Sequence, residues 1–149
     1  MLPEIMARHP KHTWTLLAGG GEGNDLRIEI RPCASPARVA DVTVAAGAEL
    51  YFLTFAGHTH TDFAYEDVDR PEVLASRIAV AAAATTGPTR VTLECAGDSL
   101  VRSRLVLDAD GPGPHEDQFV SYPFTRLKTR LLCRRVVKQV LDFPALGEN

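Results

Sequence analysis

Two histidines and an aspartate stand at alternate positions, His58, His60 and Asp62, directly after the most strand-like segment of the chain. In an extended strand, alternate side chains point to the same face. Two imidazoles and a carboxylate on one face can chelate Zn²⁺ or Fe²⁺. His115, in a later Pro/Gly-rich segment, can be recruited as a further ligand. The spacing therefore indicates one candidate metal site, with zinc or iron as its candidate cofactor.

This run resembles motifs of two metalloenzyme families. Residues 58–62 resemble the start of the H-x-H-x-D-H motif of metallo-β-lactamase-fold hydrolases, although Phe63 stands where that motif ends in histidine. The resemblance implies that the two histidines bind one zinc ion and the aspartate a second. The last three residues of the run, together with His115, also resemble the H-x-D…H facial triad of iron(II) oxygenases. That resemblance gives Arg126 the place of the arginine that binds the cosubstrate.

A polar turn between two strands explains the same run without any metal. In such a turn the threonines and histidines bond to the backbone or to water. We adopt this interpretation, and therefore assign no catalytic residue and no cofactor. The metal site, and a small metal-dependent enzyme built on it, remain the alternative hypothesis.

Two charged segments are candidate partner-binding surfaces. The first is acidic and lies at the expected start of a helix, where negative charge is favourable. The second is basic and follows i, i+4 spacing along an expected final helix, whose outer face can equally be solvated. The residues of the two segments are Glu66, Asp67, Asp69 and Glu72, and Arg126, Arg130 and Arg134.

The elements that position these residues follow from periodicity. Alternation predicts six strands, and apolar spacing predicts two helices. Asp69 and Glu72 have the spacing of a capping box at the first helix. We expect an α+β fold, a mostly antiparallel sheet of about six strands with both helices packed on one face. The strands are expected at residues 12–18, 26–31, 38–45, 49–55, 89–95 and 100–108, the helices at 70–86 and 125–141.

Length and composition limit the classes of protein. The chain has 149 residues, which predicts one domain over residues 1–149, with a loose arm or a short helical turn at 1–11 and a Pro/Gly loop at 109–117. A net charge of −3 argues against a nucleic-acid partner. The sequence has no apolar run long enough to cross a membrane, no signal-peptide pattern and no C-x-x-C among its 3 cysteines. We expect a cytoplasmic protein.

Residues 49–94 combine an aromatic strand, a polar turn, an acidic entry into a helix and a further strand. In this order they resemble small bacterial α+β proteins of the immunity type, found beside secreted toxins. The resemblance implies a protein that occupies a partner's surface and performs no chemistry. We therefore expect a protein-binding module with a protein partner, or a homodimer. The alternative is a hydrolase or iron oxygenase that uses His58, His60 and Asp62.

Overall fold

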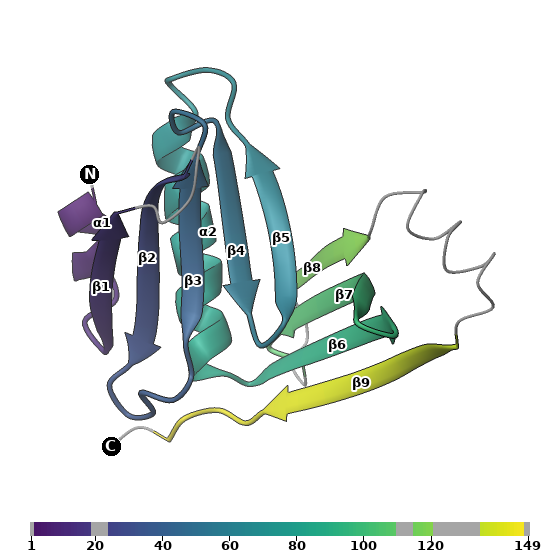
Figure 1. Cartoon of the computed structure of the whole chain (residues 1–149). Coiled ribbons are helices and arrows are strands. Elements are labelled where there is room, and N and C mark those ends of the chain that lie inside the picture. The colour runs from purple at the N-terminus through teal and green to yellow at the C-terminus, as the bar shows by residue number, and fades with distance from the viewer. Residues whose placement is uncertain (1, 19–23, 110–114, 121–134, 148–149) are drawn as a thin grey trace.

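The structure is a computed structural model that describes residues 2–18, 24–109, 115–120 and 135–147. Two antiparallel sheets and one long helix make up most of this part of the chain (Figure 1). In chain order the elements are α1 (Leu2–Ala7), β1 (His12–Ala18), β2 (Asn24–Pro32), β3 (Ala40–Ala45), β4 (Leu50–Phe55), β5 (His58–Phe63), α2 (Arg70–Thr86), β6 (Thr89–Ala96), β7 (Ser99–Leu107), β8 (His115–Val120) and β9 (Val136–Phe143).

The first sheet has five strands in chain order, β1-β2-β3-β4-β5. The second has four strands in the order β8-β7-β6-β9, so the last strand of the chain pairs with β6 and not with β8. Helix α2 packs against β2, β3 and β4, and Figure 1 shows it covering one face of the first sheet while the second sheet extends away from β5.

The prediction of about six strands with two helices on one face is wrong. The described residues contain nine strands in two sheets, with one long helix and one short one. Residues 136–143, expected mainly in the final helix 125–141, form strand β9. Three valines among the first five residues of β9 favour an extended backbone, and the open side of β6 supplies the hydrogen-bonding partner. Residues 125–134 lie outside the described part of the chain.

Two further segments complete the description. The segment 1–11 contains the short helix α1, which buries Ile5 against the core. The Pro/Gly loop at 109–117 ends early, because His115 already starts strand β8. The six expected strands are all present, with bounds that differ by at most two residues, and helix α2 has the predicted bounds.

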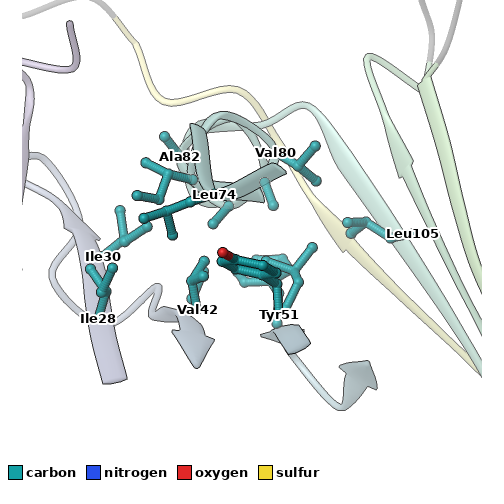
Figure 2. Close-up of a cluster of buried hydrophobic side chains, with 14 of the residues drawn as sticks. Ile28, Ile30, Val42, Tyr51, Leu74, Val80, Ala82 and Leu105 are labelled. Atoms are coloured by element: carbon teal, nitrogen blue, oxygen red, sulfur yellow. The ribbon is translucent and has the colours of Figure 1, made fainter. Parts of the chain in front are cut away.

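The core lies between α2 and the first sheet. Val42 and Val44, expected to point inward, are buried, as are Ile28 and Ile30 of the alternating strand β2. Figure 2 shows Ile28, Ile30, Val42 and Tyr51 pointing toward α2, with Leu105 of β7 at the side of the cluster. Alanines on the facing side of α2 let the helix approach the sheet closely; the buried ones are Ala81, Ala82 and Ala84.

The expected capping box is absent. Asp69 precedes α2, but its backbone is helical (φ −85°, ψ −24°) and its side chain makes no capping hydrogen bond. Its backbone carbonyl accepts hydrogen bonds from the N–H groups of Glu72 and Val73 instead. The Asp69 carboxylate is thus left exposed to solvent.

The turn between β4 and β5 explains how β5 meets the second sheet. Ala56 and Gly57 both have positive φ (49° and 83°), as in the two-residue turns that suit the twist of a hairpin. A Cβ atom added to Gly57 would lie 2.9 Å from Cδ1 of Leu93 on β6. The turn is therefore packed directly against the second sheet.

We expect Gly57→Ala to lower the free energy of unfolding by about 2 kcal/mol, because it adds a steric contact to the cost of a left-handed backbone. Gly47→Ala is the matched control, since Gly47 has φ +66° but open space around its Cα. Urea unfolding of both variants measures the difference. Equal losses would show that the contact with Leu93 contributes nothing.

Candidate functional site

A cluster of polar side chains, here called the junction cluster, lies where β5 meets the second sheet. It draws on four elements, β5, α2, β7 and β8. On β5 the three side chains point to the face that α2 covers, because they lie opposite the buried Phe55, Leu53 and Tyr51 of β4. The members of the junction cluster are His58, His60, Asp62, Arg77, Ser103 and Asp117.

The shared face of His58, His60 and Asp62 confirms the alternation argument. The polar-turn interpretation is wrong for these residues, because they form strand β5 and the turn is confined to the two residues before it. Pairing with β4 on one side and packing against the second sheet on the other hold the segment extended.

His58 is completely buried. Its Nδ1 lies 2.9 Å from the hydroxyl of Ser103, which also accepts a long hydrogen bond (3.4 Å) from the Thr59 backbone N–H. Within the described residues its Nε2 has no hydrogen-bond partner. Burial lowers the pKa of His58 to about 4, with smaller lowering effects from His60 and Arg77 that oppose the raising effect of Asp117. The imidazole is therefore neutral at pH 7.

Arg77 is the central charge of the junction cluster. Its Nη1 donates a hydrogen bond to Asp117 Oδ2 at 2.9 Å, and its Nε lies 2.8 Å from Asp62 Oδ2, a charge contact in which the N–H is not aligned for a hydrogen bond. His60 spans the same two carboxylates, with contacts of 3.4 Å to each. One guanidinium thus links the helix to β5 of the first sheet and β8 of the second.

The structure does not bring all four residues of the predicted metal site together. His115 is exposed on β8, and the residue of that strand that joins the junction cluster is Asp117. Among the residues described, no group of three or more His, Cys, Asp or Glu side chains is placed to hold a metal ion. Asp62 and Asp117 both contact the guanidinium of Arg77, whose positive charge balances theirs as a metal ion would. Arg126, the cosubstrate arginine of the oxygenase resemblance, lies outside the described residues.

The junction cluster contains serine, histidine and aspartate, the residue types of a hydrolase triad. Its geometry differs from that of a triad. Ser103 and His58 are both fully buried, so a substrate cannot reach the hydroxyl. Asp117 contacts His60 and Arg77, not His58. The arrangement holds two sheets and a helix together.

The sequence carried a signal for part of this cluster. Arg77 lies between Leu74 and Ile78 on the apolar side of α2, and a charged residue on a buried helix face requires a partner. Asp117 could not be predicted as the partner of Arg77, because we expected it in the Pro/Gly loop.

A second feature, here called the aromatic–acidic patch, begins at the last residue of β5 and continues into the segment that leads to α2. Phe63, Tyr65 and Val68 have exposed fractions of 52%, 77% and 75%, and the rings of the two aromatic residues stack at 5.9 Å with 13° between their planes. Four exposed carboxylates lie in the same stretch of the chain. These are the predicted partner-binding residues Glu66, Asp67 and Asp69, together with Glu72.

A shallow hollow of about 350 Å³ opens beside this patch. Its walls are Phe63 and the first turns of α2. Three carboxylates line it, from Asp62, Asp69 and Glu72. One acid of the patch is already paired, since Asp67 lies 2.9 Å from Arg70. The hollow thus combines an exposed aromatic ring with excess negative charge.

The basic segment with Arg126, Arg130 and Arg134 lies outside the described residues, so its role stays a prediction. Comparison with protein-family models, curated proteins and solved structures finds no match for this chain. No helix in the described ranges is long and apolar enough to cross a membrane.

Arg77→Met removes the cation and leaves the buried Asp117 with its 3.4 Å contact to His60 and no guanidinium beside it. We expect the free energy of unfolding to fall by about 3 kcal/mol, with part of the loss recovered when Asp117→Asn is added. Arg104→Met is the control, because Arg104 pairs with Glu116 in solvent on the same sheet, and its loss should change stability little. Equal effects of the two arginine variants in urea unfolding would contradict the central role of Arg77.

His58 makes stability depend on pH. Its pKa is about 4 in the folded chain and near the ordinary value of 6.5 in the unfolded chain. Between these two pH values the unfolded chain binds a proton on this histidine and the folded chain does not. The free energy of unfolding is therefore highest above pH 6.5 and falls by roughly 1.4 kcal/mol per pH unit toward pH 4. We expect His58→Gln to remove most of this slope in urea unfolding at pH 7, 6 and 5. His115→Gln, at an exposed histidine, should retain it; an unchanged slope in His58→Gln would contradict the assignment.

Proposed function

We propose that this protein is a cytoplasmic protein-binding module of the immunity type, which acts by occupying the surface of a partner protein. The aromatic–acidic patch is its binding surface. The observation that carries the proposal is the exposure of two stacked aromatic rings and a valine within six residues, Phe63 to Val68, whereas the aromatic residues Tyr51 and Phe55 of the neighbouring strand β4 are buried.

Exposed aromatic residues are costly in water and are enriched in the centres of protein interfaces. They supply large contact areas with few rotatable bonds. The carboxylates around them form a polar rim that speeds association with a partner of opposite charge. The patch therefore has the central apolar group and the charged border of a protein-binding surface.

The charge of the hollow points to the chemistry of the partner. A lysine or arginine side chain that enters between Phe63 and Glu72 can contact the aromatic ring and carboxylates together. Partner residues of this type on a basic protein surface complement the patch. The residues 49–94 that resemble immunity proteins include the whole patch, which supports the same proposal.

The position of the chemically reactive groups also supports binding over catalysis. Ser103 and His58 are enclosed, and the carboxylates of the junction cluster are held by Arg77. The cysteines support the proposed compartment. Cys33 and Cys95 are free thiols, and Cys33 is exposed, which suits a reducing environment.

The proposal is tested with a short arginine-containing peptide and its citrulline counterpart, titrated into the ¹⁵N-labelled chain. We expect the arginine peptide to shift amide signals around Phe63, Asp69 and Glu72, and the uncharged peptide to shift them far less. Phe63→Ala and Tyr65→Ala should each weaken binding about tenfold and leave stability almost unchanged, because both rings are exposed.

Leu16→Ala is the matched control, since Leu16 is an exposed apolar residue on the distant strand β1. It should bind the peptide as the unaltered chain does. Peptide shifts that map elsewhere, or equal shifts with citrulline, would contradict the proposal. Stoichiometric zinc or iron that is lost in His60→Ala would favour the metal-dependent enzyme instead.

A further inference from the structure

Strand β9 ends the second sheet, and its backbone on the side away from β6 has no strand beside it among the described residues. Figure 1 shows β9 along the outer border of that sheet. Val136, Val137 and Val140 have exposed fractions of 46%, 59% and 46%. Open edges with exposed β-branched residues readily pair with another strand. The open edge of β9 is therefore suited to pairing with a further strand.

Geometry limits how two copies of β9 can pair. In an antiparallel pair, residues opposite each other point to the same face of the sheet. A two-fold axis perpendicular to the sheet keeps each residue on the same face in both copies. Even-numbered residues can then lie opposite only even-numbered residues, and odd-numbered opposite only odd-numbered ones. One residue of β9 must therefore lie on the axis, directly opposite the same residue of the second copy.

The charges of β9 select one of the remaining registers. Its only charged residues are Lys138 and Asp142, which lie on the same face. With Val140 on the axis, Lys138 of each copy lies opposite Asp142 of the other. Two ion pairs of opposite sign then flank a central pair of exposed valines.

The neighbouring strands extend this complementarity. Glu94 of β6 lies opposite Lys138, and Glu94 in turn lies opposite Arg102 of β7. Arg90 lies opposite Asp142, with its Nε 2.6 Å from the carboxylate. Across the joined sheets, charges alternate from Arg102 through Glu94 and Lys138 of one copy to Asp142 and Arg90 of the second. Asp142 has 61% of its side chain exposed and can accept the second contact.

We propose that two copies of this chain pair antiparallel along β9, about a two-fold axis at Val140, and join their second sheets into one continuous sheet. The same register places Val137, the most exposed of the three valines, opposite Phe143 of the second copy on the other face. This surface is separate from the aromatic–acidic patch, so the dimer leaves that patch available.

Sedimentation velocity of the full chain tests the pairing through charge reversal. We expect the unaltered chain to be dimeric, and Lys138→Glu and Asp142→Lys each to raise the dissociation constant by on the order of tenfold or more, because each places like charges opposite each other twice. An equimolar mixture of the two variants should form a heterodimer, since the new carboxylate of one variant then faces the new ammonium group of the other. Circular dichroism of each variant confirms folding. Gln118→Glu on β8, the opposite edge of the same sheet, is the control and should stay dimeric.

A cross-link tests the register. In a background with the native cysteines replaced by serine, Val140→Cys should form an intermolecular disulfide under mild oxidation, because its counterpart lies directly opposite. Val136→Cys should not, since it lies opposite Pro144. A monomeric unaltered chain, or variants that are monomeric alone and fail to associate when mixed, would overturn the proposal.

Discussion

Arg77 is a buried cation that projects from the covered face of α2 and holds Asp62 of the first sheet and Asp117 of the second. A buried guanidinium is stable only when carboxylates close to it match its charge. That requirement fixes the rotation of α2, the position of β5 and the approach of β8 together. Apolar packing is non-directional, so by itself it would restrict the rotation of α2 and the positions of β5 and β8 less.

Apolar contacts complete the junction that Arg77 orients. Phe55 of β4 packs on Phe143 of β9 with their ring centres 4.9 Å apart, and Leu93 of β6 closes over the β4–β5 turn. Val91 and Leu105 continue the core into the second sheet. The two sheets thus share one hydrophobic core, although they share no hydrogen-bonded strand pair among the described residues.

Enclosed polar side chains and exposed aromatic side chains occupy different regions. Ser103 and His58 are enclosed and contribute to the junction, whereas Phe63 at the end of β5 and Tyr65 after it are exposed. Asp62 connects the two regions, because one carboxylate both contacts Arg77 and lines the hollow beside Phe63. Occupation of that hollow by a basic side chain is therefore electrostatically linked to the junction cluster.

The sequence alone determined the local elements. Alternation defined β2, β3 and β6, helical spacing with a closing Gly-Pro defined α2, and the i, i+2 spacing put His58, His60 and Asp62 on one face. Tertiary structure decided the rest. Residues 136–143 fit a helical stripe as well as a strand, and pairing with β6 selected the strand. Asp117 joins Arg77, 40 positions away, because β8 pairs with β7. Periodicity reports which face of an element is apolar, but the partner that a face or an edge meets is set by contacts between segments distant in the chain.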